Sequence, residues 1–327
     1  MKKLMFLITG IAIMVFAAVP SYAEKKITSQ RIEGLNRYET AIKISQATFN
    51  KADAAIIASG ENYPDALVAG TLAAQMEYPI FLTRKSHIEE AVVKEMQRLG
   101  VKNVYVIEGS NAIATILDED LGENFYVTRI AGKDRYETAD KVNDLRFKLR
   151  KNTTAKKGTL LTYVSGTDYP DALAAAPFLG QLDLGGMLNY MKLARKGQDV
   201  APHFVIGGPK AVISSLPNPD QVDYPYRMYG ENRYGTAVAV AENYPGMLDR
   251  EPAIAILASG ENYPDALASS PLVASNQAVL LLTRKNTLPK ETKDYLIKKG
   301  IDKVIILGGK NAVTENVVKD LESITMK

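Results

Sequence analysis

Short runs of apolar residues alternate along the chain with segments in which apolar and polar positions follow a helical period. In the first third of the sequence, the apolar runs are AAIIAS at 54–59, PIFLT at 79–83 and VYVIEG at 104–109. Helical patterns lie between them at 38–49 and 88–100. Continuously apolar strands that alternate with helices are typical of a parallel sheet covered on both faces. The pattern therefore predicts a Rossmann-like α/β domain, without the dinucleotide-binding glycine fingerprint.

The same pattern occurs three times, marked by motifs that recur in the same order. RIEGLNRYETA begins at residue 31, RIAGKDRYETA at 129 and RMYGENRYGTA at 227, so successive copies start 98 residues apart. A YPDAL box follows in each copy, with its aspartate at Asp65, Asp171 and Asp265. A period of this length is too long for a solenoid repeat, so each copy is a small domain. We expect three tandem domains at 24–125, 126–223 and 224–327.

The middle copy departs from the other two after its YPDAL box. Eighteen residues beyond each YPDAL aspartate the sequence has Thr83, Asn189 and Thr283, so IFLTRK and LLLTRK correspond to GMLNYM. By this count the middle copy has lost the apolar strand start, the threonine and the Arg-Lys pair. It is also seven residues shorter between the aspartate and the later glycine, where the other copies have a complete helix.

Composition and charge narrow the environment of the protein. Lys2 and Lys3 precede an apolar run over 4–19 and a small-residue cleavage site, which predicts a secretory signal peptide at 1–23. The run is short for a membrane anchor, so we expect no membrane contact after cleavage. Without these two lysines the chain has 38 basic and 37 acidic residues. This balance argues against nucleic-acid binding.

The residue types and motifs of common enzymes are absent from the sequence. Cysteine is missing, and the two histidines fall in different copies without a shared context. None of the serine-hydrolase, P-loop, zinc-protease or calcium-loop motifs occurs. We therefore assign no catalytic residue, cofactor or metal ligand, and we expect a protein that is not an enzyme.

The repeated boxes place charged side chains where a strand ends and a helix begins. Proline suits the first helical turn of the YPDAL box, and the next aspartate meets the positive end of the helix dipole. The first box fixes Arg37, Arg135 and Arg233 relative to a glycine turn. A guanidinium can pair with a carboxylate inside the protein or with an anion from outside. We favour a structural ion-pair network with the YPDAL aspartates of the same or a neighbouring copy, and polymer binding by some members stays open.

A further group of charged residues follows the end of an apolar strand in the first and third copies. Its members are Thr83, Arg84, Lys85, Thr283, Arg284 and Lys285. Such pairs are commonly solvated surface charge, and the alternative is a basic rim that binds an anion. Without its own pair, the middle copy would be the weakest or most divergent binder.

These motifs resemble the cell wall-binding repeat type 2 family, whose three tandem copies occur in clostridial cell wall and S-layer-associated proteins. The matched pieces are R-x-x-G-x-x-R-Y-x-T-A, S-G-x-x-Y-P-D-A-L, an apolar strand ending in L-T, and V-I-x-G-G/S-x-x-A-V. The resemblance implies Rossmann-like repeats around a pseudo-threefold axis, in a secreted protein of the Gram-positive cell surface. It also implies non-covalent binding to an anionic, teichoic-acid-like secondary polymer of the wall.

In that family the polymer contact is associated with an I-L-L strand motif. By resemblance, the motif falls on Ile80, Phe81, Leu82, Leu280, Leu281 and Leu282, with Gly186, Met187 and Leu188 in the middle copy. We expect these side chains to be mostly core, with nearby backbone and loop polar groups touching the ligand. S-layer or other wall proteins are candidate partners. The alternative functions are modulation of a cell-wall amidase and hydrolysis of wall glycan.

Overall fold

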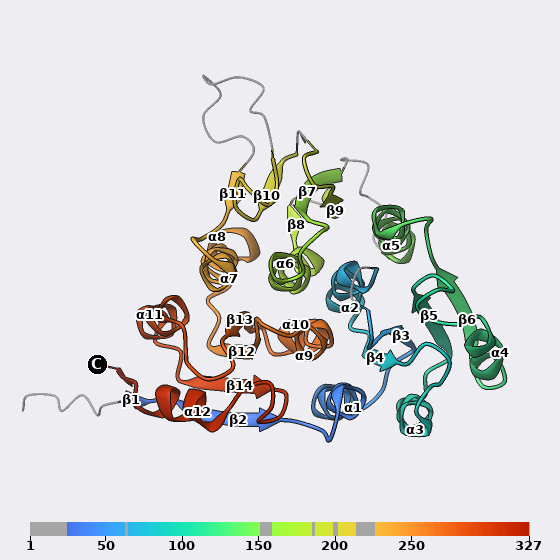
Figure 1. Ribbon diagram of the computed structural model, residues 1–327, viewed down its shortest axis with the longest axis horizontal. Helices are drawn as coiled ribbons and strands as arrows, with labels where there is room; N and C mark the ends of the chain where they lie inside the picture. The colour runs from blue at the N-terminus through green and yellow to red at the C-terminus, as the bar shows by residue number, and fades with distance from the viewer. Residues whose placement is uncertain are drawn as a thin grey trace, which may run out of the picture.

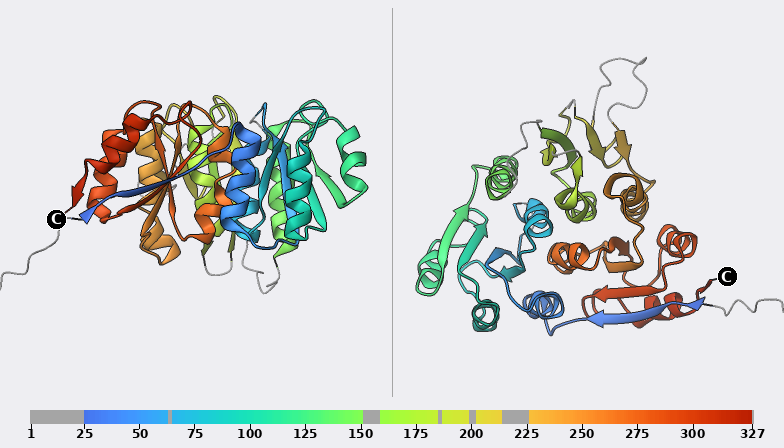
Figure 2. Two further views of the ribbon diagram at one scale, coloured as in Figure 1. Left: turned by 90° about the horizontal axis from the view of Figure 1, so that it is seen from below. Right: turned by 180° about the vertical axis from the view of Figure 1, so that it is seen from behind.

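The computed structural model describes residues 25–62, 65–150, 159–184, 187–198, 202–213 and 226–326. These residues form three α/β units around a pseudo-threefold axis, with helices from each unit at the centre (Figure 1). The helices run roughly along that axis, so the molecule is a flat disc (Figure 2). The predicted α/β class and threefold arrangement are confirmed. The predicted signal peptide, 1–23, lies outside the described residues.

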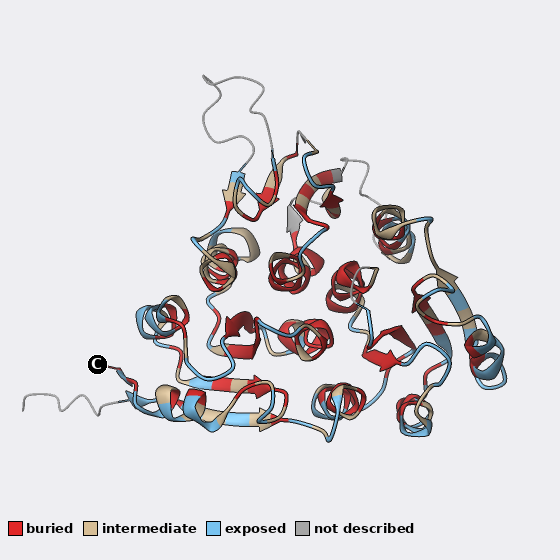
Figure 3. Ribbon diagram, viewed as in Figure 1, coloured by how far each residue is buried: buried red, intermediate tan, exposed pale blue. Residues whose placement is uncertain are grey.

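The first copy follows the predicted alternation of strands and helices. Its elements are β2 (Thr28–Ile32), α1 (Arg37–Thr48), β3 (Ala54–Ser59), a 3-10 turn (Ala66–Val68), α2 (Ala69–Met76), β4 (Ile80–Thr83), α3 (Glu90–Leu99), β5 (Asn103–Ile107) and α4 (Ile116–Gly122). Every residue of β3 is buried, because helices cover both faces of its sheet (Figure 3). Helix α1 begins after Asn36, whose side chain accepts hydrogen bonds from two backbone N–H groups of the first turn.

The other two copies repeat this order with local changes. The second contains β6 (Tyr126–Ile130), α5 (Arg135–Leu149), β7 (Thr159–Ser165), α6 (Pro170–Gln181), β8 (Asp183–Leu184), β9 (Met187–Ala194) and β10 (Phe204–Ile206). The third contains β11 (Tyr226–Met228), α7 (Arg233–Ala241), α8 (Tyr244–Leu248), β12 (Ile254–Ser259), α9 (Pro264–Leu267), α10 (Ser270–Ser275), β13 (Val279–Thr283), α11 (Lys290–Lys299), β14 (Lys303–Leu307) and α12 (Glu315–Glu322). Helices α5 and α7 are the counterparts of α1 in the second and third copies. Asp134 caps α5 and Asn232 caps α7, as Asn36 caps α1.

The first strand of each copy pairs with the sheet of the preceding copy. The sheets have the orders β4-β3-β5-β6, β11-β10-β7-β9-β8 and β13-β12-β14-β2. Strand β6 is parallel to β5, β11 to β10, and the N-terminal β2 to β14 of the third copy. A short antiparallel pair, β1 (Lys25–Lys26) with β15 (Thr325–Met326), extends the contact between the first and third copies. The hydrogen-bonded units are therefore offset by one strand from the sequence repeats, and the N-terminal strand closes the ring.

Three helices pack against one another at the centre of the disc. They are α2, α6 and α10, each beginning in or just after the YPDAL box of its copy. Gly70 on α2 faces Ser270 on α10 and Ala176 on α6. These residues stand five positions after their respective YPDAL aspartates. Small side chains at one repeated position therefore let the three helices approach closely at the axis.

The strand register corrects the alignment of the middle copy. In the first and third sheets, the serines that end β3 and β12 pair with Thr83 and Thr283. In the second sheet the equivalent Ser165 pairs with Ala194. The prediction that Asn189 takes the threonine position is wrong, and so is the loss of the Arg-Lys pair. Arg195 and Lys196 directly follow Ala194 and are that pair.

Two changes of length cancel in part and cause this error. The segment from the YPDAL box to the end of β9 is longer in the middle copy, because β9 forms an antiparallel hairpin with β8. The next segment is shorter: in its described part, 195–198 and 202–203, there is no counterpart of α3 or α11. Lys192 stands in the register position of the buried Phe81 and Leu281. It pairs with Asp140 of α5, a polar contact where the missing helix would need an apolar one.

Candidate functional site

The repeated arginines lie where β strands end and helices begin, and each binds its own copy. Nη1 of Arg135 donates to the carbonyl O of Gly166, and Nη1 of Arg233 donates to that of Gly260, both at 2.6 Å. Arg37 makes the same hydrogen bond to Gly60. Among the described residues, no ion pair within 4.0 Å joins these arginines to the YPDAL aspartates. Their direct contact is therefore a glycine carbonyl, which differs from the ion pair that we favoured.

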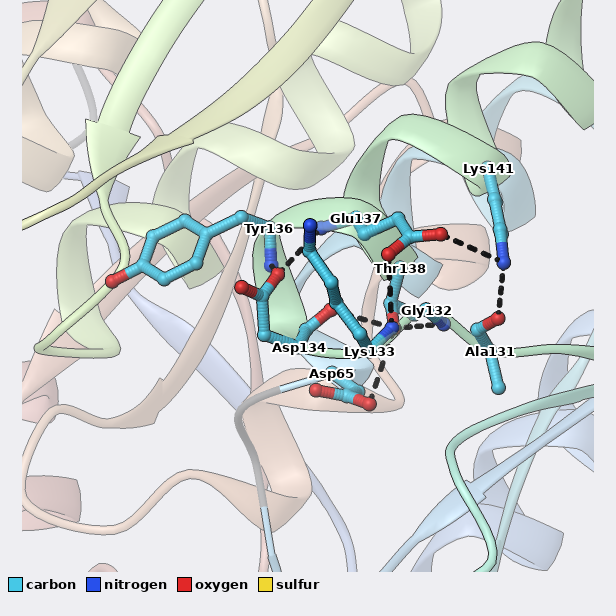
Figure 4. Close-up of polar contacts among 9 residues, drawn as sticks. All are labelled: Asp65, Ala131, Gly132, Lys133, Asp134, Tyr136, Glu137, Thr138 and Lys141. Atoms are coloured by element: carbon cyan, nitrogen blue, oxygen red, sulfur yellow. Dashed lines mark hydrogen bonds and ion pairs between the residues drawn. The ribbon is translucent and has the colours of Figure 1, made fainter.

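The YPDAL aspartates instead meet a threonine of the next copy. Thr138 Oγ1 donates to Asp65 Oδ2 at 3.2 Å and accepts from the backbone N of Gly132 at 2.9 Å (Figure 4). Equivalent side-chain hydrogen bonds join Thr236 to Asp171 and, across the closure of the ring, Thr40 to Asp265. Each junction between copies is thus built from two motifs that lie in different copies.

Burial at these junctions disfavours ionised carboxylates. It raises the pKa of Asp171 and of Asp265 to about 6, against the attraction of the neighbouring copy's Arg233 and Arg37. Burial also raises the pKa of Asp65, which the Thr138 hydrogen bond and the charge of Arg135 oppose.

The first junction differs by one buried residue. Glu108 stands where the other copies have Gly207 and Gly308, whose φ angles are 120° and 91°. A Cβ on Gly308 would lie 2.2 Å from Asp265 Oδ2, so only glycine fits beside that aspartate. Burial, followed by the charge of Asp65, raises the pKa of Glu108 to about 9. Glu108 is therefore uncharged at neutral pH.

A second set of arginines, which the sequence reasoning did not single out, reaches back into the preceding copy. Arg129 makes a bidentate pair with Asp118 at 2.6 and 2.7 Å, and donates to the carbonyl O of Glu108 at 2.8 Å. Arg227 donates to the carbonyl O of Gly207, and Arg31 to that of Gly308. The available signal was the first arginine of R-x-x-G-x-x-R, which is present in all three copies.

Three Arg-Tyr pairs stand just beyond the ends of β4, β9 and β13. Arg84 lies over the ring of Tyr38 at 4.7 Å from the centroid. The corresponding distances are 3.9 Å for Arg195 over Tyr136 and 5.3 Å for Arg284 over Tyr234. Each arginine is exposed and is followed by an exposed lysine. We call these pairs, with the lysines Lys85, Lys196 and Lys285, the platforms.

An acidic side chain also holds each platform arginine. Arg84 pairs with Glu89 at 3.2 Å, and Arg195 pairs with Asp134 at 2.9 Å. Arg284 interacts electrostatically with Glu291. The sequence reasoning missed the tyrosines and the middle-copy pair. The RY dipeptide in every copy was the signal for the tyrosines, and only the strand register reveals Arg195.

The apolar strand residues predicted near the ligand are core residues. Ile80, Phe81 and Leu82 are at most 2% exposed, and Leu280, Leu281 and Leu282 at most 3%. Thr83 and Thr283 are fully buried, and their hydroxyls bond to loop carbonyl groups. The middle-copy counterparts of Ile80 to Leu82 are Met191, Lys192 and Leu193, which corrects the assignment to Gly186, Met187 and Leu188. A ligand at this edge would meet the loops beyond these strands.

A cavity of about 550 Å³ lies at the junction of the second and third copies. It is lined in part by Asp168, Lys210, Tyr229 and Arg233. The repeated boxes therefore enclose a recess with both charge signs. Among the described residues, no group of three or more His, Cys, Asp or Glu side chains could hold a metal ion. No helix in the described ranges has the length and apolar character to span a membrane.

Comparison with known proteins identifies the repeated unit. The cell wall binding domain 2 (CWB2) family matches residues 31–116, 129–216 and 227–318. The chain belongs to the CWB2 family. The resemblance carried by the motifs is confirmed, and CWB2 membership makes this a secreted, cell-surface protein with three wall-binding modules.

Relatives of this CWB2 chain include proteins with substantial additional sequence. The N-acetylmuramoyl-L-alanine amidase LytC of Bacillus subtilis (strain 168) is 24% identical over 90% of this chain and 58% of the amidase. The amidase enhancer of the same organism is 21% identical over 90% of this chain and 40% of the enhancer. The chain thus spans between two fifths and three fifths of the length of these relatives.

Solved structures share the fold. Cwp6 from Clostridium difficile superposes with a TM-score of 0.74 at 21% identity, over 99% of this chain and 51% of Cwp6. Cwp8 from the same organism gives 0.70 at 21% identity, over 90% of this chain and 51% of Cwp8. The fold of this chain is therefore shared with Cwp6 and Cwp8 at low sequence identity.

Proposed function

We propose that this CWB2 chain anchors itself non-covalently to the wall by binding an anionic secondary polymer, and that it does so without catalysis. The observation that carries the proposal is the recurrence of an exposed Arg-Lys pair stacked on tyrosine in all three copies, at the same register position. Guanidinium groups bind phosphate and carboxylate in two-pronged geometry, and an underlying aromatic ring restricts their motion.

The charges at each platform favour a weak contact with an anion. The acidic partner offsets the arginine, and in the first and third copies the carboxylates of Glu61 and Glu261, which accept hydrogen bonds from the backbone N of Lys85 and Lys285, also offset the lysine charge. Exposed pairs of this kind contribute about 1 kcal/mol or less each. The protein carries three platforms in one rigid body. A polymer that is already bound at one platform therefore meets the other two at a raised effective concentration. The proposed anchor is therefore multivalent, and a polymer with regularly spaced charges is its natural ligand.

Wall sedimentation tests the proposal. The purified chain should sediment with intact walls and be released by excess soluble wall polymer or by high salt, because salt screens exposed charges. Walls stripped of their anionic polymer should lose the protein. Equal retention by stripped walls would refute the proposal.

Two of the relatives favour modulation of an amidase as a second candidate, because one is an amidase and another an amidase enhancer. If this candidate holds, adding the chain to walls should speed their hydrolysis by a separate amidase. The chain without added enzyme serves as the control. Release of wall fragments in that control would instead indicate the hydrolase alternative.

A further inference from the structure

A groove of about 330 Å³ lies between α1 and α3 of the first copy. These two helices stand side by side at the rim of the disc (Figure 1). The residues that line the groove include Tyr38, Ile42, Gln46, Glu89 and Ala91. Tyr38 and Ile42 are at most 6% exposed, so they form the base of the groove. The groove therefore has an apolar base and polar walls.

The third copy closes the same space with a glutamate. Asn36 and Asn232 occupy the same position in their copies, and each caps its helix through its side-chain oxygen. In the third copy, Nδ2 of Asn232 donates to Oε1 of Glu291 at 2.7 Å. Ala91 stands at the position of Glu291 in the first copy, because α3 and α11 follow strands of the same register. Nδ2 of Asn36 consequently has no acceptor among the described residues, and it borders the groove.

The second copy has no equivalent groove in its described part. The segment after β9, described over 195–198 and 202–203, contains no helix there. Asp140 is the counterpart of Ile42, and it is engaged with Lys192. Within the described ranges, this groove is therefore open in the first copy alone.

The groove continues into the platform of the first copy. Tyr38 forms part of its base and also lies beneath Arg84, whose Cζ atom is 4.7 Å from the ring centroid. Glu89 lines the groove and pairs with the same arginine at 3.2 Å. A polymer with an anionic group at this platform would therefore place a neighbouring unit in the groove.

The charges along the groove disfavour a second anion. Carboxylates outnumber ammonium groups there, since Glu39 and Glu89 face a single lysine, Lys43. Each carboxylate already has a partner in the protein. Glu39 accepts from the backbone N of Leu35 at 2.9 Å, and Glu89 pairs with Arg84. An uncharged ligand therefore fits the groove better than an anion or a strong cation.

The polar groups of the groove suit a ring that carries hydroxyl groups. The side-chain amide of Asn36 offers N–H donors. Gln46 directs Nε2 to Glu95 at 3.4 Å, which leaves its Oε1 as an acceptor. A volume of about 330 Å³ is near the lower end of the range of small-molecule sites, about 300–1,000 Å³. The groove therefore has room for one sugar ring rather than several.

We propose that the groove binds one uncharged pyranose residue of the wall polymer, next to the anionic group at the platform of the first copy. Asn36 donates to a hydroxyl of the sugar, Gln46 and Glu39 accept from others, and Ile42 contacts the apolar face of the ring. This inference rests on the proposed polymer binding. It adds a neutral sugar, a location and a stoichiometry of one per chain.

Saturation-transfer NMR on the full chain tests the site with the methyl glycosides of glucose, galactose, mannose and N-acetylglucosamine. We expect at least one of them to bind with a Kd of about 1–10 mM. Ala91→Gln places an uncharged side chain where the third copy has Glu291, and it should weaken that glycoside by about tenfold or more. Asn36→Asp keeps the helix cap, as Asp134 does for α5, but removes the donor and should also weaken it. Ala91→Ser is the matched control, because it leaves the groove open and should bind like the wild type.

Three results would overturn the groove. These are no saturation transfer to any glycoside at about 20 mM, equal binding by the wild type and Ala91→Gln, or loss of binding in the third-copy platform variant Arg284→Ala with Lys285→Ala. Ala91 is exposed, and thermal melting checks that its variants are folded. If Ala91→Gln does not fold, Asn36→Asp carries the test.

Wall sedimentation separates this inference from the proposed function. Ala91→Gln should be released from intact walls at a lower salt concentration than the wild type, because one contact with the polymer is lost. If both are released at the same salt concentration while stripped walls fail to hold the wild type, the groove alone is refuted. Retention of the wild type by stripped walls refutes polymer anchoring instead.

Discussion

Replacing Arg129 with alanine should destabilise the fold more than the same change at its counterpart Arg31. Arg129 joins β6 to the preceding copy through a bidentate pair with Asp118 and a hydrogen bond to the carbonyl O of Glu108 at 2.8 Å. The arginine and aspartate side chains are only 16% and 28% exposed. Arg31 also donates to one carbonyl at 2.8 Å, but its acidic partner Glu315 is 49% exposed and lies at 3.3 Å.

The magnitude follows from what each change leaves unpaired. Removing one partner of a buried ion pair costs about 3–5 kcal/mol, and the partial exposure of Asp118 lets water recover some of this. We therefore expect a loss of about 3 kcal/mol for Arg129→Ala. Arg31→Ala removes one hydrogen bond from a charged donor to the Gly308 carbonyl and one solvent-screened ion pair with Glu315. We expect it to lower the free energy of unfolding by about 1.5 kcal/mol.

Urea unfolding followed by circular dichroism measures both losses. Lys94→Ala is the baseline, because it removes only a surface pair with Glu90 within α3. A double-mutant cycle of Arg129→Ala with Asp118→Asn isolates the pair itself, and we expect a coupling of at least about 1 kcal/mol. If Arg129→Ala costs no more than Arg31→Ala, or if the cycle shows no coupling, the strand exchange is not held by this contact.

Three further predictions concern the junctions and the platforms. Gly308→Ala should lower the melting temperature, because φ is 91° and the new Cβ would lie 2.2 Å from Asp265 Oδ2, whereas Gly109→Ala meets no atom within 4 Å and should be neutral. The raised pKa of Asp265, about 6, means that the folded state keeps a proton which the unfolded state loses. The stability that this proton contributes is full below the unfolded pKa of about 4 and is lost as pH rises through about 6. Asp265→Asn should therefore flatten the fall in urea midpoint between pH 4 and 7. Arg195→Ala with Lys196→Ala should weaken wall sedimentation and its salt dependence as much as Arg284→Ala with Lys285→Ala does. If the middle-copy variant sediments like the wild type, the platform of the middle copy does not bind the wall.

The repeats and the α/β alternation were predictable because they depend on local patterns. A fully apolar run such as that of β3 is possible only where both faces of a strand are covered. The helical pattern at 38–49 was visible for a similarly local reason, and the structure places α1 at Arg37–Thr48. The Arg-Lys pairs of the first and third copies were also visible, because each follows its strand directly in the sequence.

What could not be predicted depends on contacts between distant segments. The position of Arg195 is set by its register with β7, and a longer hairpin and a lost helix offset any count along the chain. The pairing of β2 with β14 joins the two ends of the chain, and nothing in the pattern of β2 specifies its partner. The expected Arg-Asp interaction is electrostatic and spans more than 4.0 Å among the described residues, because a nearer acceptor, for Arg37 the Gly60 carbonyl, was invisible in the sequence.

The division of each junction between two copies gives a physical reason for the repetition. The Thr138 hydroxyl bonds to the aspartate of the preceding copy, and Arg129 bonds to that copy's glycine loop. A single copy would therefore leave one half of each contact, and one edge of its sheet, without a partner. Closing the ring satisfies every junction at once, since β2 supplies to the third copy what β6 supplies to the first. The same closure fixes the three platforms in constant geometry, so the surface that we propose for polymer binding would need little ordering when it binds.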